Sequence, residues 1–131
     1  MARVPGRPTR VLVVEDDAEV VELVSELLVR EGYAVAAART GVAAVAALTA
    51  SLEEAPQVVL LDLGLPLEDG VSVLTFLRRT IGSGLPVIVM TGRADPEAEA
   101  AVRELGITEY LRKPVSPQEL LASISSALGQ G

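Results

Sequence analysis

The sequence of 131 residues contains no cysteine and no histidine. A disulfide framework is therefore excluded, and a zinc site or histidine-based acid–base catalysis is a poor expectation. Basic residues are also few, because 11 lysines and arginines stand against 18 aspartates and glutamates, for a formal net charge of -7. We therefore expect no direct binding to nucleic acid or to an acidic membrane, and we expect oxygen ligands for any metal ion.

Long hydrophobic runs are missing as well. No apolar run reaches the roughly 20 residues that span a bilayer, and the first ten residues lack the apolar segment of a signal peptide. This pattern predicts a cytoplasmic protein. The proline- and arginine-rich start predicts a flexible arm over 1–9, followed by one domain over 10–128 and a short tail over 129–131.

Strand-like and helix-like segments alternate five times along the chain. Short apolar or β-branched runs predict strands over 10–15, 33–38, 58–61, 85–91 and 109–113. Helices are predicted over 17–30, 41–53, 96–106 and from 117 onward, with one more helix that buries Val71, Leu74, Leu77 and Ile81. The strands are apolar throughout, as in a parallel sheet covered on both faces, so the expected class is a doubly wound α/β fold.

Local signals mark several helix ends and faces. In the first helix, Val20, Val24, Leu27 and Leu28 share one face, with Leu23 beside them. Asp17 is more simply the N-cap of this helix than a metal ligand. Asp95 before Pro96, and Ser116 three residues before Glu119, predict two further helix starts, and Asp69 with Gly70 predicts a third.

Polar residues follow four of the predicted strands. In a doubly wound sheet, ligands bind outside the carboxyl ends of the strands, so these residues should converge. They are Glu15, Asp16 and Asp17 after the first strand, Asp62 after the third, Thr91, followed by Gly92, after the fourth, and Lys113, followed by Pro114, after the fifth.

Carboxylates gathered at one edge repel one another unless a cation joins them. An all-oxygen cluster favours a hard ion, and we expect Mg²⁺, for which Mn²⁺ could substitute. Lys113 would add a mobile positive charge and Thr91 a hydroxyl donor, both suited to phosphate oxygens. A carboxylate such as Asp62 can itself be the nucleophile that receives a phosphoryl group.

Four motifs carry a resemblance to a known family. The stretches "VLVVEDD", "LLDLGLPLEDG", "VIVMTG" and "YLRKPV" occur in the order and at the spacing of the receiver domain of two-component response regulators. The resemblance covers about Arg10 to Leu128. It implies a CheY-like, flavodoxin-like fold of three layers with strand order 2-1-3-4-5. It also implies a signalling switch that takes a phosphoryl group on Asp62 from a histidine kinase or phosphotransfer protein and then controls a downstream partner.

The same resemblance implies a metal site. Asp16 and Asp62 would bind Mg²⁺ directly, the backbone carbonyl of Gly64 would be a further ligand, and Glu15 would act through water. Such a domain is not an enzyme in the usual sense, because it catalyses only its own phosphorylation and dephosphorylation.

The resemblance also implies roles for the fourth and fifth strand ends. Thr91 and Lys113 would hold the phosphoryl oxygens, and the Lys113–Pro114 peptide bond would be cis. Tyr110 would be the switch aromatic, turning inward as the Thr91 hydroxyl moves. Gly64 and Arg93 occupy positions that in this family tune the lifetime of the phosphorylated form.

Three other interpretations of these residues compete with the receiver domain, and the sequence favours none of them. A haloacid dehalogenase-type phosphatase would need a second carboxylate where Gly64 stands, and a flavodoxin-type FMN carrier would need phosphate-binding groups where "EDD" stands. A receiver-like module that is never phosphorylated is the third alternative. Arg112 and Glu119 would suit a homodimer face of the fourth helix, fifth strand and fifth helix, although such charges are more often simply solvated. The chain could be a stand-alone regulator or a piece of a longer protein.

Overall fold

The computed structural model describes residues 7–51, 54–64 and 69–129. Most of the predicted N-terminal arm, residues 1–6, and most of the predicted tail, residues 130–131, lie outside this range. Thr9 is fully buried, and its carbonyl accepts a hydrogen bond of 2.8 Å from the Ala34 N–H. The packed fold therefore begins at Thr9.

Five parallel strands form one sheet in the order β2-β1-β3-β4-β5. The strands are β1 (Arg10–Val14), β2 (Ala34–Ala38), β3 (Val58–Asp62), β4 (Val87–Thr91) and β5 (Glu109–Arg112). The helices are α1 (Ala18–Arg30), α2 (Gly41–Leu48), α3 (Asp69–Thr75), which continues into the π-helical turn η2 (Phe76–Thr80), α4 (Pro96–Leu105) and α5 (Pro117–Ala127). This arrangement confirms the doubly wound fold and its strand order. None of the helices in the described ranges has the length and hydropathy that a membrane span requires.

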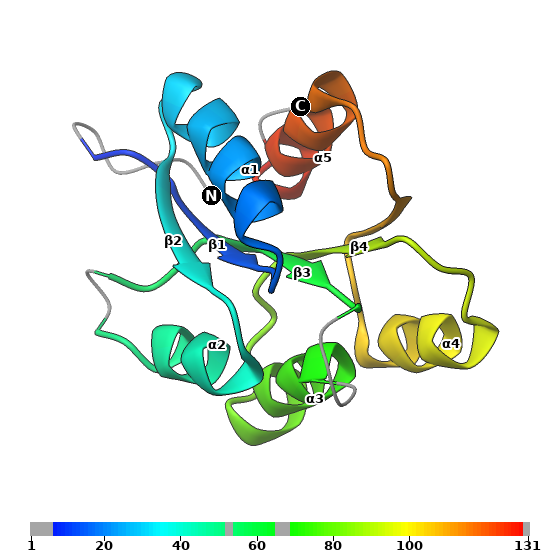
Figure 1. The fold of residues 1–131 in the computed structure, drawn as a ribbon. Coiled ribbons are helices and arrows are strands. Elements are labelled where there is room, and N and C mark those ends of the chain that lie inside the picture. Colours follow the sequence, from blue (N-terminus) through cyan, green and yellow to red (C-terminus); the bar gives the residue numbers. More distant parts are fainter. Residues whose placement is uncertain (1–6, 52–53, 65–68, 130–131) are drawn as a thin grey trace.

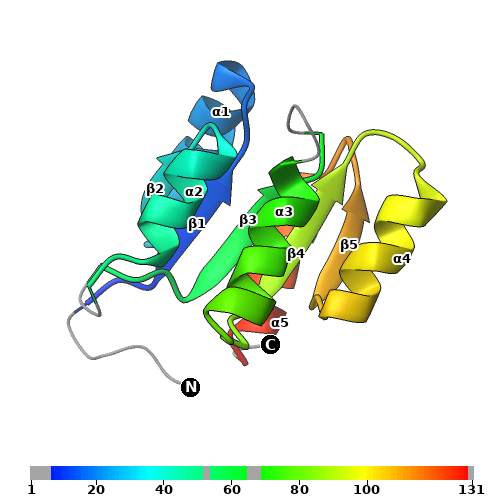
Figure 2. The same ribbon diagram turned by 90° about the horizontal axis from the view of Figure 1, so that it is seen from below.

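The sheet separates two hydrophobic cores. Helices α1 and α5 cover one face, and α2, α3 and α4 cover the other (Figures 1 and 2). Because side chains alternate along a strand, Val11 and Val13 of β1 pack toward Leu28 and Ile124, whereas Leu12 and Val14 belong to the core beneath α2, α3 and α4. Strand β3 is buried along its whole length, so its last residue, Asp62, ends inside the molecule.

Side-chain caps fix the starts of three helices that border the carboxyl edge of the sheet. The Asp17 carboxylate accepts hydrogen bonds from the Glu19 N–H at 2.9 Å and the Val20 N–H at 3.4 Å. Asp95 and Ser116 accept corresponding bonds at 3.0 and 3.1 Å. All three predicted N-caps are confirmed, and α3 begins at Asp69, as its sequence signal predicts.

Helix α2 is shorter than predicted and ends at Leu48, well before Glu53. The Thr49 hydroxyl donates to the carbonyls of Val45 and Ala46, and the Ala50 N–H bonds the Ala47 carbonyl, which tightens the last turn. These local bonds compete with continuation of the helix. The predicted end itself lies outside the described residues.

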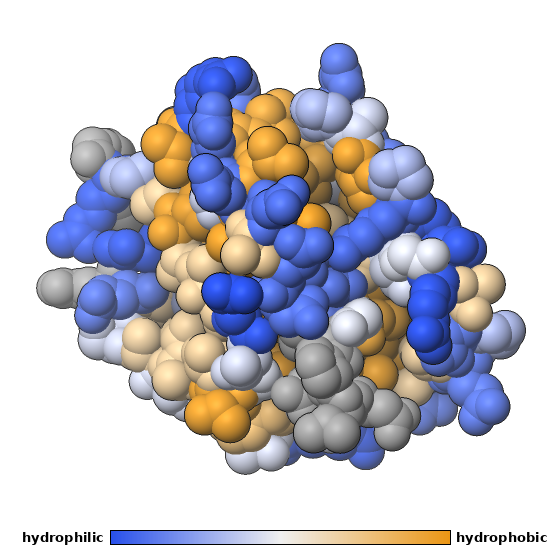
Figure 3. Space-filling view, viewed as in Figure 1, coloured by the Kyte–Doolittle hydropathy of each residue, from blue (hydrophilic) through white to orange (hydrophobic). Residues whose placement is uncertain are grey.

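Two side chains that the sequence pattern places on or beside buried helix faces are exposed. Leu23 is 68 % exposed, because it lies about 100° around the helix from Val24 and falls off the buried stripe. Figure 3 shows hydrophobic residues reaching the surface over α1. Ile81 is 40 % exposed. Its N–H bonds the Phe76 carbonyl in a π-helical turn, which rotates Ile81 away from the face that an α-helix would bury.

Candidate functional site

The carboxyl ends of β1 and β3 lie side by side at the centre of the sheet. Val14 pairs with Leu61 in the register, so Glu15 and Asp62 follow the paired positions directly. Both side chains are almost completely buried, with residue exposures of 1 % and 4 %. Because strand order reverses at β1 and β3, this is the place where a fold of this class binds ligands. In Figure 3, which has the viewing direction of Figure 1, hydrophilic residues occupy the middle of the molecular surface.

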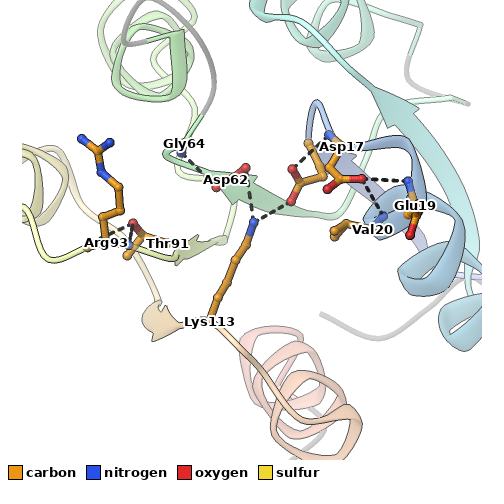
Figure 4. A network of polar contacts seen from close by, with 9 residues as sticks. Asp17, Glu19, Val20, Asp62, Gly64, Thr91, Arg93 and Lys113 are labelled. Atoms are coloured by element: carbon orange, nitrogen blue, oxygen red, sulfur yellow. Dashed lines mark hydrogen bonds and ion pairs between the residues drawn. The ribbon is translucent and has the colours of Figure 1, made fainter.

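Lys113 joins the two buried carboxylates. Its Nζ atom lies 2.8 Å from Glu15 Oε1 and 3.3 Å from Asp62 Oδ2 (Figure 4). The backbone of Lys113 is held by a hydrogen bond of 2.8 Å from its N–H to the Thr91 carbonyl. The Lys113–Pro114 peptide bond that follows is cis. One ammonium thus offsets two carboxylates that would be costly to bury unpaired.

Burial and charge change the ionisation of this group of side chains. Burial raises the pKa of the Glu15 carboxyl, and the neighbouring Asp62 raises it further, against hydrogen bonds from Lys113 and from the Asp17 N–H. Burial alone would lower the pKa of Lys113, but its contacts with Glu15 and Asp62 outweigh burial and raise it. Lys113 therefore stays a cation at neutral pH.

Three carboxylates form a cluster that could hold a metal ion. One oxygen from each of Glu15, Asp16 and Asp62 lies within 4.8 Å of the other two. Asp16 is partly exposed, whereas its two partners are buried, so the cluster opens toward solvent on the Asp16 side. An all-oxygen set of this kind fits a hard divalent cation.

Gly64 lies directly against the Asp62 carboxylate. The Gly64 N–H donates to Asp62 Oδ1 at 2.9 Å, which fixes the carboxylate in a tight turn after β3. A Cβ atom on residue 64 would lie 3.2 Å from Oδ1 and 3.5 Å from Oδ2. A side chain at residue 64 would therefore crowd both carboxylate oxygens, and glycine avoids this contact.

The Thr91 hydroxyl is engaged with the backbone of Arg93. It donates to the Arg93 carbonyl at 3.1 Å and accepts from the Arg93 N–H at 3.3 Å (Figure 4). Thr91 is buried at the end of β4, one strand away from Asp62. Its position at the carboxyl edge is as expected, but its hydroxyl is bonded within its own loop.

Tyr110 is half-buried beside the core beneath α4. The Arg103 guanidinium lies over its ring, 5.3 Å from the centroid, and the Arg103 Nε is held by Glu99 at 3.0 Å. Burial raises the pKa of the Tyr110 hydroxyl, and the nearby Glu99 adds to that rise. Sequence reasoning did not identify Arg103, although its spacing of four residues from Glu99 is a signal for a helical ion pair.

A second arginine that sequence reasoning missed lies next to the carboxylate cluster. Arg39 follows β2 directly, and its Nε and Nη2 atoms donate to the Asp16 carbonyl at 3.3 and 3.0 Å. Its position after a strand, at the edge where the other site residues lie, is the only signal that the sequence offers.

Gly70 packs closely against the backbone of Asp62 and Leu63. A Cβ atom at this buried position would lie 2.9 Å from the Asp62 carbonyl oxygen and 3.0 Å from the Leu63 Cα. We expect Gly70→Ala to push the Asp62–Leu63 backbone and lower the free energy of unfolding by about 1–3 kcal/mol. Urea unfolding followed by circular dichroism measures the change.

Gly84→Ala is the matched control, because a Cβ atom there meets nothing within 4 Å. This variant should be close to neutral. Equal losses in the two variants would contradict the close approach at Gly70.

Comparison with known proteins identifies a family. The model of the response regulator receiver domain matches residues 11–125. The DNA-binding response regulator MtrA of Mycobacterium tuberculosis is 38% identical over 119 residues, which cover 91% of this chain and 50% of MtrA. The transcriptional regulatory protein KdpE of the same organism is 37% identical over 120 residues, covering 92% of this chain and 51% of KdpE. The chain thus spans about half the length of these relatives.

A solved structure gives the same result for the fold. A CheY-like response regulator receiver domain protein from Methanospirillum hungatei superposes with a TM-score of 0.86 at 29% identity, covering 95% of this chain and 96% of that one.

Proposed function

Because the chain belongs to the family of response regulator receiver domains of two-component systems, we propose that Asp62 accepts a phosphoryl group from a histidine kinase or a phosphotransfer protein. The observation that carries this proposal is the Lys113 ammonium, placed between the buried carboxylates of Glu15 and Asp62. Such a group both offsets the negative charge of the nucleophile and remains in place to meet the incoming phosphoryl oxygens.

The proposed transfer step takes place at the Asp62 carboxylate. A carboxylate oxygen attacks the phosphorus atom of a phosphohistidine, the P–N bond breaks, and the imidazole leaves and takes up a proton. The product is an acyl phosphate on Asp62. The Gly64 N–H, 2.9 Å from Oδ1, holds the carboxylate in one orientation during the attack. Lys113 and Thr91 bind the phosphoryl oxygens, and Thr91 gives up its bond to the Arg93 carbonyl to do so.

A divalent cation fits beside this acceptor. Asp16 and Asp62 would hold Mg²⁺ directly, together with the Gly64 carbonyl, and Glu15 would act through water; Mn²⁺ could substitute. The all-oxygen cluster of Glu15, Asp16 and Asp62 supports this assignment. When bound, the ion neutralises charge on the transferred group.

Phosphorylation would then shift a conformational equilibrium. Movement of the Thr91 hydroxyl toward the phosphoryl group leaves room for Tyr110 to turn inward, which remodels the face formed by α4 and β5. We propose that residues 10–128 form this switch unit, that it works in the cytoplasm on a downstream partner, and that it catalyses only its own phosphorylation and dephosphorylation. A homodimer through α4, β5 and α5 would use the exposed Arg112 and Glu119.

Intact-mass measurement after incubation with acetyl phosphate tests the proposal. We expect a gain of one phosphoryl group in Mg²⁺ and none in excess EDTA. If no gain occurs, the same assay is run with the cognate histidine kinase. Continued failure in a folded protein would favour an unphosphorylated interaction module, and steady release of phosphate from small phosphoesters would favour a phosphatase.

The metal site makes a separate prediction for stability. Mg²⁺ at about 100 times its dissociation constant should raise the free energy of unfolding by about 2.7 kcal/mol, because it binds only the folded cluster. Asp16→Asn should lose most of this response. It should also raise metal-free stability, because it relieves repulsion among three carboxylates.

Thermal unfolding with and without MgCl₂ measures both effects. Asp17→Asn is the matched control, because Asn also caps helices and Asp17 bonds the first turn of α1. Equal melting temperatures of the wild-type protein in the two conditions would contradict the metal site.

A further inference from the structure

Arg39 binds the loop that carries Asp16, the partly exposed residue of the carboxylate cluster. Two guanidinium nitrogens, Nε and Nη2, converge on a single acceptor, the Asp16 carbonyl, at 3.3 and 3.0 Å. The contact joins the end of β2 to the loop between β1 and α1, which are separated by 23 positions in the sequence. Asp16 contributes its carboxylate to the cluster and its carbonyl to Arg39.

The rest of this loop is fixed on both sides of that carbonyl. The Glu15 N–H donates to the Ala38 carbonyl at 3.0 Å, directly before Arg39. The Asp17 N–H donates to Glu15 Oε2 at 3.2 Å, and the Asp17 side chain caps α1. Arg39 therefore completes the restraint of the Asp16 peptide group. Because the backbone orientation sets the direction of the side chain, the restraint also aims the Asp16 carboxylate at the cluster.

The charge of Arg39 would act against a cation. Its guanidinium binds a neutral carbonyl, so no carboxylate of the site neutralises it in this contact. A positive charge next to a cation site weakens binding of the cation by repulsion. An arginine here therefore has two opposite effects, a favourable one through geometry and an unfavourable one through charge.

We propose that Arg39 is a positioning residue that pre-arranges the Asp16 carboxylate for the divalent cation, and that this geometric effect exceeds the repulsion. The inference rests on the proposed function of the carboxylate cluster. It assigns the end of β2, which carries none of the predicted ligands, a part in building the metal site.

Titration calorimetry with Mg²⁺ alone tests the inference on the full chain. Arg39→Met removes both the charge and the donors, and we expect it to raise the dissociation constant for Mg²⁺ about tenfold, as loss of an outer support does in other metal sites. Arg39→Lys keeps the charge but loses the two-pronged donor, so its dissociation constant should also rise. Arg30→Met is the control, because Arg30 is an exposed cation at the far end of α1.

The sign of the change separates the two effects. A lower dissociation constant in Arg39→Met, with no change in Arg39→Lys, would mean that charge dominates and would overturn the inference. Unchanged values in both variants would overturn it as well and leave the proposed function intact. A folded wild-type protein that neither binds Mg²⁺ nor takes up a phosphoryl group would overturn both. If Arg39→Met does not fold, the Arg39→Lys result decides.

Discussion

Asp62→Asn is expected to abolish phosphoryl uptake from acetyl phosphate in the presence of Mg²⁺. The amide has no carboxylate oxygen that can attack phosphorus, and no other described carboxylate has both the open turn of Gly64 and the Lys113 contact. The variant should still fold, since an amide oxygen can accept the bond from the Gly64 N–H. Intact mass is the measurement, with the wild-type protein treated in parallel.

Asp95→Asn provides the matched control for this substitution. Asp95 is an exposed N-cap of α4, a role that Asn also fills, so this variant should gain a phosphoryl group like the wild-type protein. A full mass gain in Asp62→Asn would show that another residue is the acceptor.

Lys113→Met is expected to slow phosphorylation by about a hundredfold or more, because it removes the cation that faces the developing charge. It should also destabilise the protein by about 1–3 kcal/mol at neutral pH, since two buried carboxylates lose their counter-charge. The loss should be smaller than for a fully buried pair, because the Lys113 side chain is 29% exposed. Phosphorylation time courses and urea unfolding measure the two effects.

Two companion variants separate the position of Lys113 from its charge. Arg112→Met removes the neighbouring exposed cation and should change neither quantity appreciably. Lys113→Arg keeps the charge on a wider, planar head and should have an intermediate rate. A wild-type rate in Lys113→Met would remove this residue from the phosphoryl site.

The parallel sheet was predictable because its strands carry a strong signal, whereas the strand order came from the resemblance to receiver domains. Continuous apolar runs such as Val58 to Leu61 indicated strands buried on both faces, and the helices between them required a parallel sheet. The meeting of Glu15, Asp62 and Lys113 followed from one rule, that parallel strands end at the same edge. Residues 98 positions apart therefore form a contact of 2.8 Å.

Sequence reasoning missed features that depend on tertiary contacts or on local hydrogen bonds, which hydrophobic periodicity does not reveal. Arg39 and Arg103 bind a loop carbonyl and an aromatic ring, and exposed arginines elsewhere in the chain have the same local sequence character. The π-helical turn after α3 is a local departure from helical period, and it moves Ile81 to the surface. The early end of α2 depends on hydroxyl bonds of Thr49, whereas alanine-rich sequence favours a longer helix.

Identifying the residue that carries the phosphoryl group tests the central claim most directly. An acyl phosphate on an aspartate is reduced by borohydride to homoserine, so peptide mapping after phosphorylation and reduction identifies the residue that carried it. We predict homoserine at position 62 in Mg²⁺ and unmodified aspartate there in EDTA. Reduction at Asp16 or Glu15 in its place, or a stable phosphate on a hydroxyl such as Thr91, would contradict the assignment of Asp62 as the acceptor.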